Sequence, residues 1–350
     1  MTEIKYGALT GIKSTNVFSC TLPEIKDDEL LLKVEMCNIC TFDYQRWLGL
    51  RECKFPFSDG HEYTGIIVKK GKSVIDEFKI GDRVGKLYNY CGICENCRSG
   101  RTGDCQYRPP ETPDENGFYG QKAFANYKII PQRLAIKISN ELNPEEAAFL
   151  EPVSTVVHGL KKLAIQPCQN VVIVGAGTMG IVNAQVAKTY GANIIMCDLS
   201  EKKIKRAMSM GLGPVIDSKN QNPVEEVFKL TNGVGADVVI VSVGNTIAYK
   251  QGYEMLRKHR GKMLFFPANF PKPEFQCDPN EIHYRKIELI GTVDADVCDF
   301  VQASKLLSSR KIDVSFALEG KTIGLKDFQK AMEAAATLDS YRVSVDCQDI

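Results

Sequence analysis

The sequence has almost no net charge, and it lacks a long apolar run and an amino terminus like that of a signal peptide. Its 44 Lys and Arg residues are matched by 43 Asp and Glu residues, so the formal net charge of +1 gives no drive toward nucleic acid or an anionic membrane. Apolar runs such as residues 171–174 are far too short to cross a bilayer, and residues 1–11 lack the apolar core of a signal peptide. The expected location is the cytoplasm, with no nucleic-acid or membrane partner.

Internal repeats, low-complexity tracts and long linkers are also missing, so a compact chain is expected. With 350 residues and about 150 residues per domain as a guide, two domains are predicted. The hydrophobic fraction of 44% and the charged fraction of 25% are typical of a folded globular protein. We expect one domain over residues 1–152, a second over 153–291, and a last segment, 292–350, that carries no motif of its own.

The first domain is predicted to be mainly β and the second to be α/β. Before residue 153, short alternating or β-branched runs are separated by Gly, Pro and Asp turns. These runs cover residues 29–34, 63–68, 124–130 and 134–137. Beyond it, six apolar runs alternate with helical segments, which predicts a parallel sheet. They cover 170–174, 193–197, 214–216, 236–241, 262–266 and 287–290, with helices expected over 178–190, 200–211, 297–307 and 325–336.

A glycine-rich motif, G-x-G-x-x-G, follows the apolar run at 171–174 and opens a predicted helix. Its first glycine permits a tight turn, its second lets the backbone approach a pyrophosphate, and its third lets the helix pack on the strand. The helix N-terminus adds oriented N–H donors for the phosphates. The predicted dinucleotide-binding residues here are Gly175, Gly177, Thr178, Met179 and Gly180.

An acidic residue closes the next apolar run, 18 residues after the last glycine of the motif. The carboxylate of Asp198 can accept hydrogen bonds from both ribose hydroxyls and would repel a 2′-phosphate, so NAD is favoured over NADP. Lys202 and Lys203 lie close by and weaken this preference slightly, and Lys203 is included in the cofactor site. In the alternative interpretation the glycines serve ordinary turns and Asp198 caps a helix.

Thirteen cysteines are present, an odd number, and four of them fall within 15 residues. Cys91, Cys94, Cys97 and Cys105 have the spacing C-x2-C-x2-C-x7-C. Four thiolates saturate a tetrahedral zinc ion, so we predict a structural site with no open coordination position. A nucleic-acid-binding zinc ribbon is the competing interpretation, but its two C-x2-C pairs stand about 15 to 20 residues apart in basic surroundings. Free thiols in a reduced loop are the third possibility.

A second set of metal-ligand residues is found earlier in the chain. A catalytic zinc ion needs three protein ligands and a replaceable water, and Cys40, His61 and Glu62 are the remaining candidates. Their spacing alone also fits a buried cysteine beside a surface imidazole, so the residues by themselves leave both interpretations open.

With these residues assembled, the chain resembles the zinc-dependent medium-chain alcohol dehydrogenases, in particular their sorbitol (polyol) and threonine dehydrogenase branch. Residues 60–65, followed by Gly71 and Val74, reproduce the family signature G-H-E-x2-G-x5-G-x2-V. Residues 81–84 (GDRV) and 151–154 (EPVS) and the four-cysteine loop occupy family positions as well. The resemblance spans nearly the whole chain.

The resemblance implies a GroES-like β domain, formed by the amino-terminal part and the last segment, and a Rossmann domain, with the active cleft between them. It implies that Cys40 and His61 hold a catalytic zinc ion, to which Glu62 or Glu151 supplies a carboxylate directly or through water. Asp43 is expected to orient His61 by accepting its other ring N–H. A homodimer or homotetramer is also implied.

The activity implied is reversible hydride transfer between NAD and a secondary alcohol: a polyol, sugar alcohol or cyclitol. An amino alcohol like threonine or a phosphorylated polyol is the alternative, and a catalytically inactive or structural zinc protein is the alternative of another class. The chain departs from the family at Phe42, where a Ser or Thr usually relays the alcohol proton, so Glu151 or a chain of waters is expected to serve instead. Arg46 is a candidate for gripping an anionic substrate.

Overall fold

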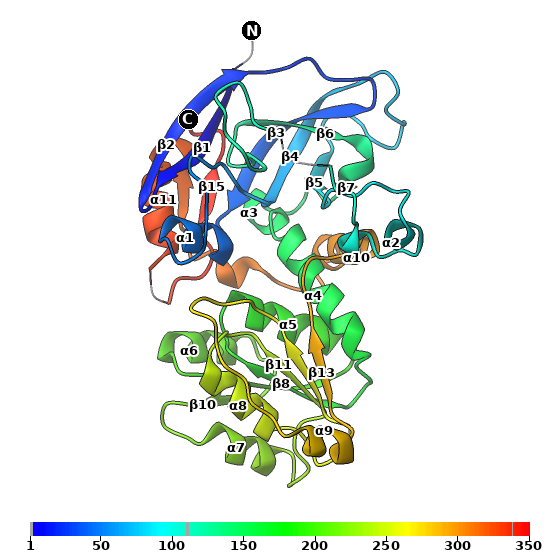
Figure 1. Ribbon diagram of the computed structural model, residues 1–350, viewed down its shortest axis with the longest axis vertical. Helices are drawn as coiled ribbons and strands as arrows, with labels where there is room; N and C mark the ends of the chain where they lie inside the picture. Colours follow the sequence, from blue (N-terminus) through cyan, green and yellow to red (C-terminus); the bar gives the residue numbers. More distant parts are fainter. Residues whose placement is uncertain (1–2, 110–111, 338) are drawn as a thin grey trace. The chain divides into compact units, whose positions relative to one another are not determined.

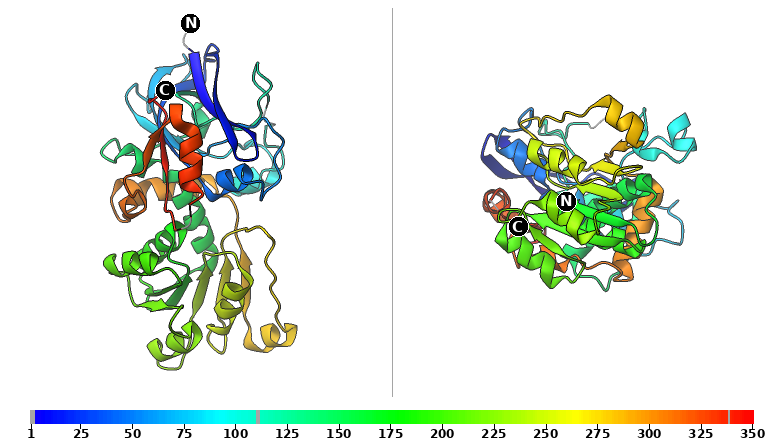
Figure 2. Two further views of the ribbon diagram at one scale, coloured as in Figure 1. Left: turned by 90° about the vertical axis from the view of Figure 1, so that its left-hand side faces the viewer. Right: turned by 90° about the horizontal axis from the view of Figure 1, so that it is seen from below.

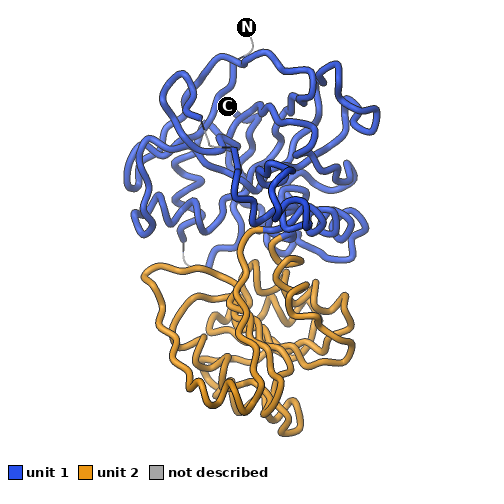
Figure 3. The backbone as a smooth tube through the Cα atoms, turned by 45° about the vertical axis from the view of Figure 1, so that its right-hand side comes forward, with its two compact units in different colours: residues 1–154, 295–350 blue, residues 155–294 orange. Residues whose placement is uncertain are grey.

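The computed structural model describes residues 3–109, 112–337 and 339–350. The chain forms two compact units, shown in different colours in Figure 3. Unit 1 contains residues 1–154 and 295–350, and unit 2 contains residues 155–294. The chain therefore leaves unit 1 once, builds unit 2 in one stretch, and returns to unit 1.

Unit 1 is built on a seven-stranded sheet with the order β14, β15, β3, β4, β5, β7, in which β6 pairs with β3. The strands are β3 (Glu29–Asn38), β4 (Glu62–Lys70), β5 (Arg83–Lys86), β6 (Tyr127–Pro131), β7 (Ala135–Lys137), β14 (Thr322–Gly324) and β15 (Ser344–Asp346). Strand β15 runs antiparallel to β3 and places Val345 opposite Cys37. The last segment thus contributes strands to the sheet that the amino-terminal part begins.

Strand β3 of unit 1 alternates only over its middle residues, because Leu31 on the opposite face is also buried. In β3, Leu30, Leu32 and Val34 are fully buried, whereas Lys33 between them is exposed. Successive side chains of a strand point to opposite faces, so this alternation puts one face of β3 in the core. Ile67 of β4 and Phe124 join the same apolar cluster.

A separate hairpin of β1 (Glu3–Gly11) and β2 (Ser14–Thr21) completes the β part of unit 1. Helix α11 (Phe328–Ala335) lies along this hairpin in Figures 1 and 2, and Gln329 Oε1 accepts hydrogen bonds from the N–H and the hydroxyl of Thr15 at 3.0 and 2.8 Å. The other helical elements of unit 1 are α1 (Thr41–Trp47), α2 (Glu95–Arg98), η1 (Thr102–Asp104), η2 (Gln132–Leu134), α3 (Pro144–Ala147), α10 (Val297–Ser308), η3 (Ser315–Ala317) and η4 (Leu325–Asp327).

Unit 2 contains a six-stranded parallel sheet with the order β10, β9, β8, β11, β12, β13. The strands are β8 (Asn170–Val174), β9 (Asn193–Asp198), β10 (Val215–Asp217), β11 (Val238–Val241), β12 (Lys262–Phe265) and β13 (Glu288–Gly291). This is the strand order of doubly wound dinucleotide-binding sheets, in which ligands bind at the carboxyl ends of the strands.

Helices cover both faces of this sheet (Figure 2), so the central strands are apolar without alternation. The four residues 238–241 of β11 are buried, with at most 1% of any side chain exposed. The helices are α4 (Leu150–Leu163), which begins in unit 1 and continues into unit 2, α5 (Thr178–Thr189), α6 (Glu201–Ser209), α7 (Pro223–Leu230), α8 (Thr246–Glu254) and α9 (Pro279–Arg285).

The predicted parallel sheet is confirmed, and most of the expected elements differ from the observed ones only at their ends. The strand expected over 124–130 begins at Tyr127, because Ala125 forms only an isolated bridge with Tyr6. The pattern at 325–336 divides into η4 and α11. Within the described residues, no helix has both the length and the apolar character needed to cross a membrane.

Candidate functional site

The structure brings Cys40, His61 and Glu62 together in unit 1. Their potential ligand atoms all lie within 4.8 Å of one another. Cys40 follows β3 and caps helix α1, whereas His61 immediately precedes β4 and Glu62 is its first residue. Because β3 and β4 are antiparallel neighbours that pair Asn38 with Glu62, the end of one strand meets the start of the next. Local strand pairing therefore assembles a sulfur, an imidazole and a carboxylate.

Glu62 is buried, and its two carboxylate oxygens have different surroundings. Its Oε1 accepts a hydrogen bond from Arg342 Nη2 at 2.6 Å, in an ion pair whose side chains are 1% and 8% exposed. Its Oε2 is buried and has no hydrogen-bond partner among the described residues. Buried polar atoms are nearly always satisfied, so this oxygen fits a ligand such as a divalent cation. Sulfur, imidazole nitrogen and carboxylate oxygen are the donors that zinc takes in proteins.

Asp43 holds the turn around Cys40 and lies beside the His61 ring. Its Oδ2 accepts a hydrogen bond from the Cys40 backbone N–H at 2.8 Å, and its Oδ1 lies 3.9 Å from His61 Nδ1. Because Asp43 faces Nδ1, Nε2 of the imidazole is left for a cation. Burial raises the pKa of Asp43 to about 7. Burial by itself lowers the pKa of His61, but the charge of Asp43, the hydrogen bond and charge of Cys40 and the charge of Glu151 together raise this pKa well above its usual value.

Glu151, in the first turn of α4, lies outside the group of mutually close donor atoms. Its Oε1 accepts a hydrogen bond from the Tyr88 hydroxyl, and burial raises the pKa of the carboxyl to about 7. The sequence left open which glutamate supplies a carboxylate to the metal. The geometry favours Glu62 as the direct donor and leaves Glu151 as a nearby buried acid.

Phe42 and Arg46 lie on helix α1, next to the candidate ligands. The Phe42 ring meets the His61 ring edge-on at a centroid distance of 6.2 Å. Arg46 forms an ion pair with Asp59 and stacks over Phe42. The charge of Arg46 is therefore already matched within the protein.

Sequence reasoning did not identify Arg342, Tyr88 or Asp59 as part of this region. Arg342 is 280 residues from Glu62, and Tyr88 is 63 residues from Glu151. No local pattern marks such pairs, since they meet only when the sheet has formed. Asp59 lies two residues before His61, and an acidic residue beside a metal-ligand motif was an available signal.

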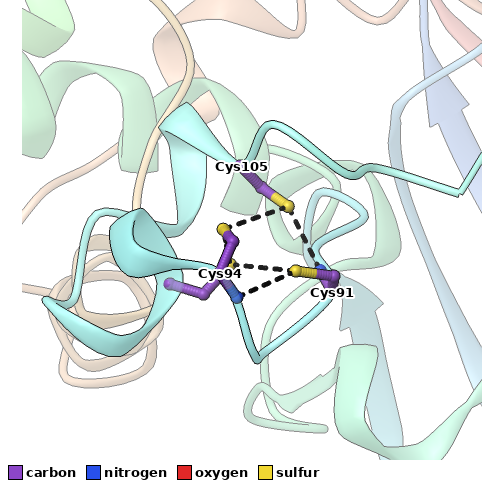
Figure 4. Close-up of side chains that lie close together, drawn as sticks. Cys91, Cys94 and Cys105 are labelled. Atoms are coloured by element: carbon purple, nitrogen blue, oxygen red, sulfur yellow. Dashed lines mark hydrogen bonds between the residues drawn. The ribbon is translucent and has the colours of Figure 1, made fainter.

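The potential ligand atoms of the four clustered cysteines all lie within 4.8 Å of one another in unit 1. Figure 4 shows Cys91, Cys94 and Cys105 of this group. The Sγ atoms of Cys94 and Cys97 are 3.4 Å apart, those of Cys91 and Cys97 are 3.9 Å apart, and those of Cys94 and Cys105 are 4.0 Å apart. Four sulfurs around a tetrahedral zinc ion, each about 2.3 Å from it, are separated by roughly 3.8 Å. The described cysteines form no disulfide. This geometry fits a closed four-sulfur zinc site.

Backbone hydrogen bonds already favour the thiolate forms of Cys91 and Cys94, whereas burial raises the pKa of Cys97 to about 12. The N–H of Cys94 donates to Cys91 Sγ at 3.3 Å and that of Cys91 donates to Cys105 Sγ at 3.2 Å. Hydrogen bonding, first of all with the backbone of Cys97, lowers the pKa of Cys94 to about 6. Zinc binds the thiolate form, so these bonds prepare the loop for the ion.

The far side of the cysteine loop is attached to helix α10. The N–H of Gly103 donates to Asp296 Oδ1 at 2.9 Å, and the N–H of Val297 donates to Thr102 Oγ1 at 2.9 Å. The loop therefore links the amino-terminal part of unit 1 to its carboxyl-terminal part.

The predicted dinucleotide loop connects β8 to α5 in unit 2. Gly175 has a φ of +101°, which only glycine adopts without strain. A Cβ on Gly180 would lie 1.8 Å from the carbonyl oxygen of Gly175, whereas one on Gly177 would meet no atom within 4 Å. Gly180 is thus required for packing, and Gly177 faces open space where a pyrophosphate can approach. Thr178 and Met179 form the first turn of α5, whose amino end begins at this loop.

Asp198 ends β9 beside this loop. Its Oδ2 accepts a hydrogen bond from the N–H of Ala176 at 2.6 Å, and its Oδ1 accepts one from the N–H of Ser200 at 2.8 Å. The carboxylate is therefore held against the glycine-rich turn at the carboxyl ends of the strands. Lys203 lies in the first turn of α6, where its N–H donates to the capping Ser200 hydroxyl at 3.4 Å.

Residues 26–140 match the family described as alcohol dehydrogenase GroES-like domain, and residues 178–309 match the family described as zinc-binding dehydrogenase. A sorbitol dehydrogenase of Bacillus subtilis is 32% identical over 340 residues, which cover 95% of this chain and 94% of that protein. An L-threonine 3-dehydrogenase of Alteromonas mediterranea is 28% identical over 335 residues, covering 93% and 94% of the two chains.

A solved structure of a zinc-binding dehydrogenase from Sinorhizobium meliloti, bound to NADP, superposes with a TM-score of 0.87 at 25% sequence identity. The superposition covers 99% of this chain and 100% of the other chain. The expected GroES-like and Rossmann architecture is confirmed, as is the resemblance to sorbitol and threonine dehydrogenases. The chain belongs to the zinc-dependent medium-chain alcohol dehydrogenase family.

Proposed function

We propose that this dehydrogenase transfers a hydride reversibly between NAD and a secondary alcohol of the polyol, sugar alcohol or cyclitol class. The observation that carries the proposal is the set formed by Cys40, His61 and Glu62, in which a buried carboxylate oxygen has no hydrogen-bond partner in the part of the chain that the structure describes. Three protein ligands leave a coordination position open, which is typical of catalytic zinc and unlike the saturated four-sulfur loop.

We assign a different role to each of the residues around this set and around the glycine-rich loop. Zinc held by Cys40, His61 and Glu62 would act as a Lewis acid that eases loss of the alcohol proton, and a nicotinamide cofactor would supply the hydride acceptor. In this proposal Asp43, whose Oδ1 lies 3.9 Å from His61 Nδ1, orients the imidazole. Arg342 holds Glu62 by Oε1, and Oε2, which has no hydrogen-bond partner among the described residues, is available to the ion. Gly177 admits the pyrophosphate, and Asp198 is placed to read the adenosine ribose.

Glu151 and Tyr88 are proposed to handle the alcohol proton. Phe42 has no hydroxyl to relay it, and the two side chains already share a hydrogen bond. A buried carboxyl with a pKa raised to about 7 can take up or release a proton near neutral pH.

Preference for NAD over NADP is part of the proposal. The Asp198 carboxylate, held by two backbone N–H groups, places a negative charge where a 2′-phosphate would lie. The Sinorhizobium meliloti structure contains NADP, so both dinucleotides belong in the assay. A cytoplasmic location, a homodimer or homotetramer, and functional domains at 1–152, 153–291 and 292–350 complete the proposal.

An amino alcohol substrate is the second candidate, because a relative with similar coverage is named L-threonine 3-dehydrogenase. One experiment separates the candidates: production of NADH is measured with polyols, cyclitols and L-threonine, with and without a chelator, and zinc is counted in the same sample. We expect about two zinc ions per chain and chelator-sensitive turnover of a polyol. Zinc-free turnover, or no turnover of any alcohol, would overturn the proposal.

A further inference from the structure

A small cavity lies beside Asp43 in unit 1. Its volume is about 10 Å³, which is close to the space that the centre of one water molecule needs. Its polar lining residues are Asp43, Arg46 and Asp59, and its other lining residues are apolar or glycine. The cavity therefore combines room for a single water molecule with polar groups that can bind one.

Two of these polar residues carry a buried atom that has no hydrogen-bond partner among the described residues. These atoms are Asp43 Oδ1 and Arg46 Nε. The side chain of Asp43 is 3% exposed and that of Arg46 is 18% exposed. The carboxylate oxygen accepts hydrogen bonds and the guanidinium N–H donates them. Because buried polar atoms are nearly always satisfied, an acceptor and a donor of this kind beside one cavity indicate a bridging water.

Helix α1 and the segment before β4 bring these groups together. Asp43 and Arg46 are three residues apart on α1, so they share one face of the helix. A carboxylate oxygen of Asp43 and one of Asp59 lie within 4.8 Å of each other and of a ring nitrogen of His61. A water with two hydrogen bonds of about 2.8 Å at a tetrahedral angle spans roughly 4.6 Å. One molecule can therefore reach both carboxylates.

The guanidinium of Arg46 is held in place by three groups. Its Nη1 donates to Asp59 Oδ2, and its Cζ lies 4.1 Å from the ring centroid of Phe42 and 4.5 Å from that of Phe57. Guanidinium N–H groups donate in the plane of the group, so the ion pair and the two rings restrict the directions in which Nε can donate. Arg46 is thus suited to fix a water in one position.

The charges around the cavity favour water over a metal cation. Asp43, Asp59 and His61 have donor atoms close enough together to hold a metal ion. Arg46, however, adds a positive charge to the same lining, and its ion pair engages the carboxylate of Asp59. A water can accept a hydrogen bond from Arg46 and donate one to Asp43, whereas a cation would be repelled by the guanidinium.

We propose that one water molecule bound in this cavity bridges Arg46 Nε and Asp43 Oδ1, and that Arg46 acts through it as a positioning residue for His61. Asp59 anchors Arg46, the water holds Asp43, and Asp43 Oδ1 lies 3.9 Å from His61 Nδ1. Outer partners of this kind orient a metal-binding histidine and strengthen its hold on the ion. The inference rests on the proposed zinc site and adds the groups that support it.

The water itself is tested without turnover. A high-resolution crystal structure of the zinc-loaded enzyme should show a water within hydrogen-bond distance of Arg46 Nε and Asp43 Oδ1. In solution, the Nε–H of Arg46 should give a nuclear Overhauser cross-peak with water. Arg83 is the internal control, because its Nε–H donates to Glu35 Oε2 at 2.7 Å and should give no such cross-peak. A cavity without this water, or with a metal ion in its place, would overturn the proposal.

The positioning role is tested by the zinc affinity of the Cys40, His61 and Glu62 set. Arg46→Met keeps an apolar side chain beside the two rings but removes the ion pair and the Nε–H. We expect the affinity to fall by roughly 10- to 100-fold, the range for loss of an outer partner. Arg46→Lys keeps the charge, but its one ammonium group cannot both pair with the acid and fix the water, so it should lose nearly as much. Full affinity in Arg46→Lys would show that charge alone matters.

Two references separate this effect from general destabilisation. The four-cysteine loop contributes no residue to the cavity, so it should retain its metal equally in every variant. Co²⁺ in place of zinc distinguishes the two sites, because a site with four sulfurs absorbs differently from a site with one. Arg257→Met removes an arginine from its ion pair with Asp237 in unit 2 and should change neither affinity. Unchanged affinity in Arg46→Met, or equal loss at both sites, would overturn the positioning role.

The outcomes for this cavity and for the proposed function can be told apart. If Arg46→Met does not fold, the crystal structure and the water cross-peak of the wild type still decide whether the bridge exists. A wild-type enzyme that oxidises no alcohol would overturn the proposed function, but it would leave the result for the cavity water standing.

Discussion

The two metal-ligand sets of unit 1 differ in how completely their donors are used. The four-cysteine loop brings together donors of one kind, which saturate a tetrahedral ion and are attached by Asp296 and Thr102 to helix α10. The set of Cys40, His61 and Glu62 mixes three kinds of donor, and it is surrounded by acids and cations that orient them. The first arrangement is suited to holding the chain together and the second to chemistry at an open position.

The largest expected effect is a loss of stability caused by a substitution in the four-cysteine loop. Cys94→Ser removes one of four thiolates, and structural zinc contributes roughly 10 kcal/mol or more to folding in small zinc modules. We expect a large fall in the thermal unfolding temperature and loss of one zinc ion. Cys168→Ser, which changes an exposed thiol of unit 2, is the control and should alter neither. A Cys94→Ser protein with unchanged zinc content would contradict the four-sulfur assignment.

The complementary change acts on the other set. His61→Ala removes a donor that Asp43 orients, so kcat should fall on the order of a thousandfold as the electrophile is lost. Binding of NADH, measured by fluorescence, should remain close to that of the wild type, because the glycine-rich loop lies in unit 2. Equal damage to cofactor binding would show that the two functions are not separable in this way.

A smaller effect tests whether Glu62 is a ligand or only the partner of Arg342. Glu62→Gln leaves a buried guanidinium without its counter-charge, which costs about 3–5 kcal/mol. Adding Arg342→Met should recover most of this stability in urea unfolding, but it should not restore zinc binding or turnover. Recovery of turnover by the double variant would assign Glu62 a purely structural role.

The smallest effect concerns Glu151, the acid outside the donor set. Glu151→Gln should retain both zinc ions and lower kcat by roughly 10- to 100-fold, which is the range for loss of a general acid or base. Because the raised pKa keeps this carboxyl protonated below about 7, wild-type alcohol oxidation should increase as the pH rises through that range. Glu151→Gln should lose this rise in activity with pH, and Tyr88→Phe should shift the pH at which the rise occurs. If Glu151→Gln kept the wild-type rise in activity with pH, transfer of the alcohol proton through Glu151 would be excluded.

The four-cysteine loop and the glycine-rich loop could be predicted from the sequence, because each is formed by residues close together in the chain. The spacing of the four cysteines and the glycine motif indicate their geometry because all their members lie within one loop or one strand–turn–helix unit. The β1–β2 hairpin was not predicted, nor was the Arg46–Asp59 ion pair. The hairpin has weak alternation, and the ion pair depends on how α1 lies against the segment that precedes β4. Such contacts follow from tertiary packing, which residue patterns do not encode.

Arg46 shows most clearly what could not be predicted from the sequence. From the sequence it was the candidate for an anionic substrate, since nothing nearby identified a partner. In the structure Asp59 neutralises it, and Arg51, which the sequence did not single out, lies on the same ring. The residue type was informative, but whether the charge of Arg46 is already matched depends on the position of Asp59, 13 residues away in the chain.

The ion pair between Glu62 and Arg342 has a consequence for biosynthesis. Translation delivers the acid early and its cation 280 positions later, after all of unit 2 has been made. Until then the carboxylate cannot be buried without a large electrostatic penalty, so the nascent amino-terminal sheet must leave this corner hydrated. Maturation of the reactive centre is therefore a late event in folding, whereas the cysteine loop has its four sulfurs available much sooner.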